Sequence, residues 1–370
     1  MDKSYLLFCQ GLVAFCIIFA PMAAFANTSL SFTDMKEAVA TASQPNPPWS
    51  GPTTGPAAQK DKQIAIIAED LKNGGILGVA QGVAEAARIL DWHLKVFDAG
   101  GTQSGREDAF RKISSGTFDG LVVIGSDADA SKSRLQTIAS RNIPIVGWHV
   151  SATPGKLTNS PLAVNVSTDP LKVAQITAMS AVTQSTGTAG FVIFTDSNFN
   201  IAISKSNAMA DVIRACAQCT LLEIKDVPIS QSGDRIGDIT RELLLKYGPR
   251  WTYALAINDV YFDDMMPELI KAGPQGAHVK LLSAGDGSAA AFQRIITHSF
   301  QYGTVAEPLN LHGWQLADEL NRLLAGQPVN GFVFPVHLVT PDNVFLDGGL
   351  RFIFDPQNNY REIYKGIWAP

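Results

Sequence analysis

The stretch that decides the fold is Ile64-Ala-Ile-Ile-Ala-Glu-Asp-Leu-Lys-Asn-Gly-Gly-Ile-Leu-Gly-Val-Ala-Gln-Gly-Val-Ala-Glu-Ala-Ala87. Its first five residues, 64–68, form a short apolar run, which is typical of a parallel strand covered on both faces. From Leu77 onward the apolar residues recur at spacings of three and four, which predicts an amphipathic helix. A glycine-bearing loop at 69–75 joins the two. Because open α/β sheets bind ligands beyond the carboxyl ends of their strands, we expect this loop to border a binding site.

Length and composition indicate a large globular protein. The chain has 370 residues, of which 46% are hydrophobic, and this predicts a substantial core divided between two domains or lobes. The formal net charge is −5, and no run of lysines and arginines stands out in the sequence. The lack of a basic stripe argues against nucleic acid as a partner.

The first 26 residues have the pattern of a cleaved signal peptide. Lys3 supplies a positive start, residues 5–20 are apolar with two interruptions, and Ala24-Phe-Ala26 is an A-x-A cleavage site. We therefore predict a signal peptide over residues 1–26, cleavage after Ala26 and export to the periplasm. A membrane anchor is the alternative, and the short apolar core argues against it.

Two cysteines remain after this cleavage, in the sequence Cys216-Ala-Gln-Cys219. In an oxidising compartment a local disulfide is the simplest interpretation. A redox motif would be expected at the N-terminus of a helix, where the thiolate is stabilised, but this motif falls near the end of a predicted helix. A zinc site would need a second pair of ligands, and none is evident.

A leader at residues 27–62 precedes the regular pattern. We expect a short helix at 33–42, then an extended proline-rich segment that reaches Pro56, with Trp49 anchoring it to the body. From Gln63 onward strands and helices alternate, which favours parallel sheets with right-handed crossovers. In the first half we expect strands at 64–68, 94–97, 120–124, 144–148 and 162–166, and helices at 77–90, 106–115 and 131–141.

The alternation restarts near Leu171, so the chain has two similar α/β halves. We expect helices at 171–183, 202–217, 234–247, 263–272, 289–297 and 309–324. The strands of this half are expected at 191–194, 220–224, 253–257, 279–283, 303–306 and 332–336.

Enzyme motifs are weak or missing in the sequence. Asn73-Gly-Gly-Ile-Leu-Gly78 follows a strand and opens a helix, but its glycines lack the G-x-G-x-x-G spacing of a dinucleotide site. There is no G-x-S-x-G elbow and no phosphate-binding P-loop sequence. The six histidines show no paired metal-ligand spacing. We therefore expect no catalytic residues, no cofactor and no metal site.

Polar or aromatic residues recur instead where the predicted strands end. Any one of them could be an ordinary helix N-cap, but as a set facing one cleft they describe a pocket for a small polar solute. They include Glu69 and Asn73 after the first strand, Asp127 after the third, Trp148 and His149 at the fourth, and Phe199, Asp259, Asp286 and Glu307 after later strands.

Several of these segments together resemble the periplasmic solute-binding proteins of sugar ABC transporters, of the ribose-binding type. The resemblance covers about residues 63–339 and rests on the opening strand-loop-helix, Phe118-Asp-Gly-Leu-Val-Val-Ile124, Asn142-Ile-Pro-Ile-Val146, Ala256-Ile-Asn-Asp259, Ser283-Ala-Gly-Asp-Gly287 and Gly303-Thr-Val-Ala306.

The resemblance implies the α/β type I periplasmic binding protein fold. In this fold, two Rossmann-like lobes, each a parallel sheet flanked by helices, are joined by a three-strand hinge. We place the N-terminal lobe at residues 63–166 and 308–336, and the C-terminal lobe at 167–307 and 337–370. The resemblance also implies that the ligand is enclosed when the lobes close.

The family also implies positions for ligand contacts. Asn73, Asp127, Asp259 and Glu307 fall where the family contacts its ligand, as do, less closely, Glu69, His149 and one residue of 205–207, for which we choose Asn207. Gly75 and Ile76 replace the stacking aromatic residues of ribose binders, and Trp148 or Phe199 could supply that surface. With its carboxylates ionised, the cleft would disfavour anions, so we expect a neutral or cationic ligand.

The implied function is that of a periplasmic receptor. It would bind a sugar, polyol or related hydroxylated solute in the interlobe cleft and deliver it to a membrane ABC permease, with no enzymatic activity. The alternative is a chemosensory or quorum-sensing-type receptor that signals to a membrane sensor. In either case we expect a monomer.

Overall fold

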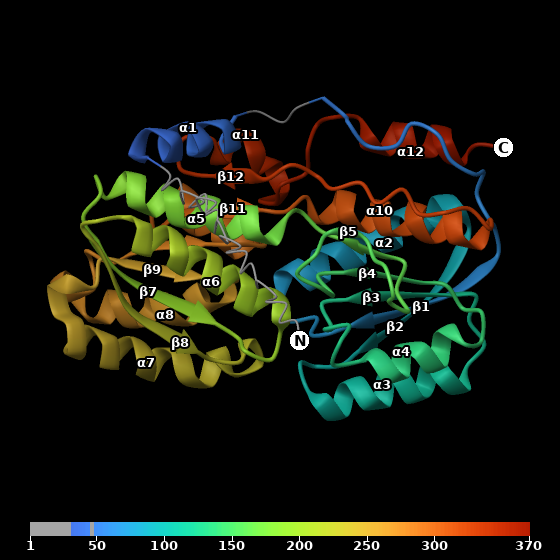
Figure 1. Ribbon diagram of the computed structural model, residues 1–370, viewed down its shortest axis with the longest axis horizontal. Coiled ribbons are helices and arrows are strands. Elements are labelled where there is room, and N and C mark those ends of the chain that lie inside the picture. Colours follow the sequence, from blue (N-terminus) through green and yellow to red (C-terminus); the bar gives the residue numbers. More distant parts are fainter. Residues whose placement is uncertain (1–30, 45–47) are drawn as a thin grey trace, which may run out of the picture.

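A computed structural model describes residues 31–44 and 48–370 of the chain (Figure 1). The predicted signal peptide lies outside the described residues. The described chain forms two lobes, each built on a six-stranded sheet with helices on both faces. No helix within residues 31–44 and 48–370 is long and apolar enough to cross a membrane.

The first sheet has the strand order β2-β1-β3-β4-β6-β5. All its neighbours pair in parallel except β5 and β6. Its strands are β1 (Lys62–Ala68), β2 (Trp92–Asp98), β3 (Gly120–Ile124), β4 (Ile145–Trp148), β5 (Gly155–Lys156) and β6 (Val164–Val166).

The second sheet has the order β12-β11-β10-β9-β7-β8, with only β12 antiparallel to its neighbour. Its strands are β7 (Ala189–Thr195), β8 (Cys219–Asp226), β9 (Tyr253–Ala256), β10 (Lys280–Ser283), β11 (Gln301–Ala306) and β12 (His337–Val339).

Helices cover both sheets, and the longer ones match the expected apolar periodicity. They are α1 (Phe32–Ala42), α2 (Gly74–Leu90), α3 (Gln103–Ser115), α4 (Lys132–Ala139), α5 (Pro170–Gln184), α6 (Asn200–Ala215), α7 (Ser232–Tyr247), α8 (Val260–Lys271), α9 (Ala289–Ile296), α10 (Leu309–Leu324), α11 (Val344–Asp347) and α12 (Tyr360–Trp368). Short 3-10 turns lie at Ile229–Gln231, Gly248–Arg250, Gly273–Gln275 and Gly349–Arg351.

Strand β1 is the centre of the first lobe, as its sequence predicted. Residues 64–68 are fully buried, and the strand pairs with β2 on one side and β3 on the other. Helix α2 then lies against α10, and Val79, Val83 and Leu90 contribute to the core there. The predicted two-lobed α/β fold is therefore confirmed.

The last strand differs from the prediction. Residues 332–336 are all apolar, as in a buried strand, but they form an irregular segment, and the strand β12 begins at His337. The carbonyl of Phe332 accepts a hydrogen bond from the side chain of Gln315 instead of joining a sheet. Phe334 is buried against Phe354. The segment is apolar because it packs between helix and tail, and not because it pairs with a strand.

The leader contacts both lobes. Helix α1 packs against α5 of the second lobe, and the predicted short helix is confirmed. Trp49 packs against Phe332 and Tyr364 on the side of the first lobe. Further along, the backbone oxygen of Thr54 accepts a hydrogen bond from Arg322 of α10. The described parts of the leader, residues 31–44 and 48–60, therefore contact both lobes, and we call them the strap.

The end of the chain also returns to the first lobe. Helix α11 contacts α9, whereas α12 packs against α10, where Trp368 donates a hydrogen bond to Asp318. The sequence analysis grouped all of residues 337–370 with the second lobe. The described chain therefore crosses between the lobes four times, at the three expected hinge segments and between α11 and α12.

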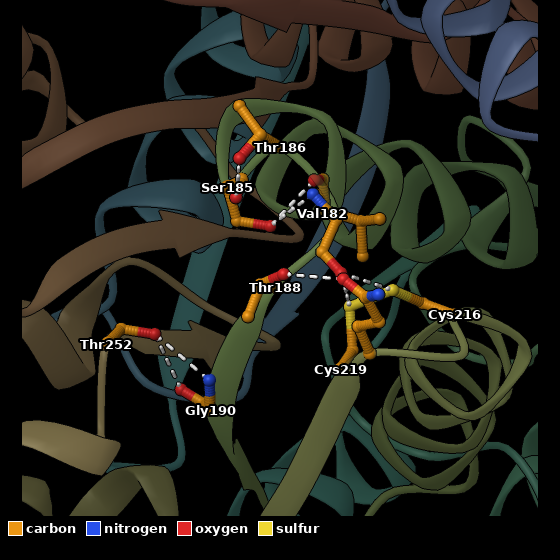
Figure 2. Close-up of a disulfide and its surroundings, with 10 residues drawn as sticks. Val182, Ser185, Thr186, Thr188, Gly190, Cys216, Cys219 and Thr252 are labelled. Carbon is orange, nitrogen blue, oxygen red and sulfur yellow. Dashed lines mark hydrogen bonds between the residues drawn. A yellow bond between two sulfur atoms is a disulfide. The ribbon is translucent and has the colours of Figure 1, made fainter.

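Cys216 and Cys219 form a disulfide at the end of α6 (Figure 2). Both sulfur atoms lie close to the backbone oxygen of Gly187. The bridge spans three positions in sequence and joins the last turn of α6 to the start of β8. This is the local disulfide that the sequence analysis favoured.

Replacing both cysteines by serine should have a small effect on stability. A loop this short removes little entropy from the unfolded chain, so the loss in unfolding free energy should not exceed about 2 kcal/mol. Ligand binding should not change, because the 16 residues of α6 place the bridge about 24 Å from the end that faces the other lobe. Chemical denaturation and ligand titration of the double variant check both points. A loss of binding would show that the bridge supports the site.

Candidate functional site

A cavity of about 60 Å³ lies between the lobes, where the carboxyl ends of the strands in both sheets meet. Both lobes supply its walls. The lining residues are Asn73, Ile76, Gly125, Trp148 and His149 from the first lobe, and Phe199, Ile201, Ala202, Lys205, Ile229, Ile257, Asn258 and Asp286 from the second. Five predicted site residues are thus brought together here: Asn73, Trp148, His149, Phe199 and Asp286.

Asn73 is placed by the start of α2. It is the N-cap of that helix, and its side-chain oxygen accepts a hydrogen bond from the backbone N–H of Gly75 at 2.9 Å. An asparagine at this position satisfies one of the free N–H groups of the first turn. Its amide N–H₂ remains available on the cavity side. The two glycines that follow let the opposite lobe approach the helix closely.

His149 is fixed from several directions. Its backbone has φ +52°, a left-handed conformation that is uncommon for a residue other than glycine and costs free energy. Its ring stacks on Trp148 with centroids 3.7 Å apart. The Trp148 N–H donates to Nδ1 of the buried His312 at 3.1 Å, which fixes the indole in turn. The imidazole therefore has one orientation, with one nitrogen toward Glu307 and the other toward Asp286.

Glu307 lies behind His149, away from the cavity lining. Its Oε1 lies 2.8 Å from Nε2 of His149. Although burial opposes ionisation, the pairing with His149 holds the pKa of Glu307 well below its ordinary value. Nδ1 of His312 also lies 3.3 Å from Oε2 of Glu307, but that nitrogen already accepts the Trp148 hydrogen bond and has no proton to donate. Glu307 is thus a positioning carboxylate for His149.

Asp286 is the carboxylate that faces the cavity. Its Oδ2 accepts a hydrogen bond from Asn258 at 2.8 Å, and its Oδ1 lies 4.0 Å from Nδ1 of His149. Burial raises the pKa of Asp286 to about 6, and the nearby His149 and the Lys205 ammonium oppose that rise. Lys205 is itself buried and donates to the backbone oxygen of Ala284 at 2.7 Å.

Asp259 faces the loop that carries Asp286. Its Oδ2 accepts from the backbone N–H of Gly287 at 2.8 Å and of Ser288 at 3.3 Å, and its Oδ1 accepts from Gln301 at 2.8 Å. It is buried, and burial raises its pKa. Asp259 therefore shapes the loop, and a ligand contact by this carboxylate would require these bonds to be broken.

Three other predicted residues lie outside the cavity lining. Glu69 is buried and pairs with Arg106 and Ser126 within the first lobe. Asp127 accepts from the N–H groups of residues 129 and 130, and its Oδ2 accepts from the Asn200 N–H of the other lobe at 3.1 Å. Asn207 is exposed on α6. Asp127 thus joins the lobes at the edge of the cleft.

The sequence analysis missed the apolar wall of the cavity. Ile76, Ile201, Ile229 and Ile257 line it, and such residues next to strands and helix starts look like ordinary core positions. It also chose the wrong lining position on α6, since Lys205 lines the cavity. The sequence held one signal for Lys205: it lies four residues after Ile201, so the two side chains share a helix face.

The arrangement changes the expected charge of the site. The expected charge rested on four ionised carboxylates, those of Glu69, Asp127, Asp259 and Glu307. The only carboxylate among the described lining residues is instead that of Asp286, and Lys205 accompanies it. Glu307 is paired with His149, and Glu69 with Arg106. The carboxylates are thus neutralised internally, so the basis for expecting a cationic ligand disappears, whereas a neutral ligand still fits.

His149, Asp286 and Glu307 have ligand atoms within 4.8 Å of one another, a spacing that a metal ion could bridge. However, the Lys205 ammonium acts on Asp286 from close range, and a divalent cation there would be repelled. The His149–Glu307 contact at 2.8 Å is an ordinary hydrogen bond. We therefore interpret the group as a hydrogen-bonding cluster.

A larger hollow of about 930 Å³ lies behind the hinge, between α1, the start of α5 and residues 333–337. None of the ten predicted site residues lines it. It lies away from the strand ends at which α/β folds bind ligands. The small interlobe cavity is therefore the better candidate site.

Comparison with known proteins identifies the family and the fold of the chain. The family model described as "periplasmic binding protein domain" matches residues 64–328. No curated protein sequence matches the chain. Many solved structures share the fold.

Three of these structures are solute-binding proteins of ABC transporters. One from Agrobacterium vitis with bound allitol has TM-score 0.67 and 16% identity, covering 76% of this chain and 96% of its own. One from Bacillus halodurans with bound myo-inositol has TM-score 0.66 and 14% identity, covering 77% and 96%. One from Actinobacillus succinogenes with bound D-allose has TM-score 0.67 and 14% identity, covering 77% and 99%. These likenesses show that the chain shares the fold of these proteins.

The variant Gly75→Ala should hinder closure of the cleft. A Cβ added at position 75 would lie 2.2 Å from Oδ2 of Asp286, on the opposite lobe. Overpacking of this kind costs about 1–3 kcal/mol, so ligand affinity should fall by about tenfold or more while each lobe stays folded. Titration calorimetry with any identified ligand measures the effect. Gly237→Ala on α7 is the control, because its Cβ meets nothing closer than 3.6 Å. Equal affinities for both variants would contradict the predicted contact.

Asp286 should make stability fall as the pH rises from about 4 to about 6. Its folded pKa of about 6 lies above its ordinary value of 3.8, so within this window the unfolded state releases the proton that the folded state retains. The loss should amount to about 3 kcal/mol relative to the Asp286→Asn variant. Chemical denaturation of both proteins at several pH values measures the difference. Parallel stability curves would show that Asp286 titrates normally.

Proposed function

Because this chain belongs to the periplasmic binding protein domain family, we propose that it is a receptor for a small hydroxylated solute, of the sugar, polyol or related class. It binds the solute in the interlobe cavity and delivers it to a membrane ABC permease. It acts in the periplasm as a monomer and does not transform its ligand.

The main support for this proposal is the composition of the cavity. Both lobes contribute polar groups to it, Asn73 and His149 from the first and Asn258 and Asp286 from the second. A solute bound there is enclosed by both lobes, so its binding is linked to their closure. The Asp286 carboxylate can accept hydrogen bonds from hydroxyl groups, and the side-chain amides of Asn73 and Asn258 can donate hydrogen bonds to them.

A binding function without chemistry fits the same residues. The lining includes no serine, threonine or cysteine among the described residues, so His149 has no hydroxyl or thiol nucleophile beside it to activate. Its other nitrogen is occupied by Glu307. The cluster is suited to holding a neutral polar group in a fixed orientation.

A thermal-shift screen tests the proposal. The panel contains sugars, polyols, short alcohols, amino acids and organic acids. A ligand at about a hundred times its dissociation constant adds about 2.7 kcal/mol, which raises the melting temperature by several degrees. Only hydroxylated neutral compounds should give such shifts, and Asp286→Asn should abolish them. Asp238→Asn, at an exposed position of α7, is the matched control. Shifts confined to amino acids or organic acids would overturn the proposal.

A further inference from the structure

Helix α6 begins at the edge of the cleft with a residue that cannot cap it. Phe199 holds the N-cap position, and its phenyl ring offers no oxygen to the first N–H groups of the helix. These groups have no partner inside a helix and need an acceptor from elsewhere. The backbone oxygen of Phe199 accepts from Ala202 and Ile203. The N–H of Asn200, at the first helical position, therefore needs an acceptor outside α6.

That acceptor comes from the other lobe. Oδ2 of Asp127, in the loop after β3 of the first lobe, accepts the Asn200 N–H at 3.1 Å. A carboxylate at this place also lies at the positive end of the α6 dipole, where negative charge is stabilised. Oδ2 of Asp129 adds a longer contact of 3.4 Å to the side-chain amide of Asn200. An aspartate of one lobe thus caps a helix of the other.

The two oxygens of Asp127 have different partners. Oδ1 accepts the N–H groups of Asp129 and Ala130 in its own loop, at 2.9 and 3.0 Å. Because these bonds lie within the first lobe, they fix the carboxylate whether the lobes are open or closed. The bond from Asn200 to Oδ2 can form only when the lobes are closed. Asp127 is buried, yet it does not line the cavity.

A reciprocal contact lies on the other side of the cleft. Helix α2 follows β1 as α6 follows β7, and the Asp286 carboxylate of the second lobe lies against Gly75 in the first turn of α2. Each lobe therefore sets a carboxylate against the start of a helix in the other lobe. The two contacts differ in one respect, because α2 already has its own cap in Asn73. The contact at Asp127 is the one in which closure supplies a cap.

We propose that Asp127 sets the balance between the open and closed arrangements of the lobes, because it caps α6 only when the cleft is closed. This cap raises the closed population before any ligand binds. It therefore increases the affinity for a ligand of the cavity without contacting that ligand. The family resemblance implied a ligand contact for Asp127 instead. The inference goes beyond the proposed function, since it concerns the lobes alone and holds for any ligand.

Double electron–electron resonance on ligand-free protein measures this balance. The protein is expressed from the full-length sequence, then denatured and refolded to remove any bound ligand. Spin labels at Ser114→Cys on α3 and Asp238→Cys on α7 report the separation of the lobes, because both positions are exposed and the two helices belong to different lobes (Figure 1). The native cysteines are closed in their disulfide and take no label.

The wild type should show a short-distance and a long-distance population. Asp127→Asn should lower the ratio of short to long about fivefold, the usual effect of a lost helix cap. The asparagine keeps one oxygen for its own loop, whereas its N–H₂ cannot accept from Asn200. Asp119→Asn is the matched control, because Asp119 accepts a backbone N–H from Gln63 within the first lobe, at the opposite end of β3. It should leave the distances unchanged.

Asn200→Pro removes the same hydrogen bond from the other lobe. Proline is favourable at the first helical position, and Phe199, with φ −125° and ψ 122°, already has the extended conformation required before proline. This variant should also favour the open arrangement, and adding Asp127→Asn to it should cause no further opening. Circular dichroism confirms that the variants are folded.

Three results would overturn the proposal. They are a wild type with the long distance alone, distances unchanged by Asp127→Asn, and opening by Asp127→Asn and Asn200→Pro that adds in the double variant. Weaker ligand binding by Asp127→Asn with unchanged ligand-free distances would identify a direct ligand contact instead. Because the distances are measured without ligand, these results leave the receptor function standing, and the thermal-shift screen tests that function separately.

Discussion

The buried carboxylate of Asp259 holds together the half of the site that belongs to the second lobe. It accepts hydrogen bonds from two successive backbone N–H groups, at Gly287 and Ser288, and from the side chain of Gln301. The two N–H groups lie in the loop after β10, and Gln301 is the first residue of β11, so one side chain links the segment after β9 to both neighbouring strands. Asp286 is adjacent to the loop N–H groups that Asp259 binds. The position of the Asp286 carboxylate, which faces the cavity, therefore depends on the Asp259 carboxylate, which does not.

The first lobe is built in the same way. Glu69 is buried at the end of β1, where it pairs with Arg106 of α3 and accepts from Ser126 after β3. Asp127 braces the start of α4 and reaches across to Asn200. Charged side chains at strand ends thus form the frame, and the cavity itself is left to isoleucines, two amides and the His149–Asp286 pair. This division explains why the sequence predicted an acidic cleft, whereas the described lining of the cavity is nearly neutral and about half apolar.

The sequence predicted the architecture well because apolar periodicity is a local property. The run at 64–68 and the helix after it could be assigned from their own residues, and so could most other elements. The site residues were harder to predict, because the sequence shows that a carboxylate follows a strand but not the direction in which its side chain points. Asp259 turns away from the cavity through Gln301, 42 positions later in the chain. Ile229 and Ile257 carried no signal that distinguished them from core residues.

The choice between Lys205 and Asn207 shows the same limit on a smaller scale. Two positions on a helix differ by about 200° in direction, so a neighbouring choice turns the side chain from the cavity to the solvent. The strand predicted at 332–336 was wrong for a related reason, because an apolar run reports which side chains are buried and not which backbone partner is present. Its aromatic residues are buried by the strap and the tail, two segments that no periodicity connects to it.

The strap also limits how the two lobes can move. Helix α1 is fixed to α5, and Trp49 is fixed to the first lobe, so both ends of the connection from Ser43 to Trp49 are anchored. Six peptide units can span at most about 20 Å, and this length is an upper bound on the separation of the two anchors. Opening of the hinge can therefore separate these two anchors by no more than this length. The leader thus sets an outer limit on how far the lobes can part, although its described residues do not line the cavity.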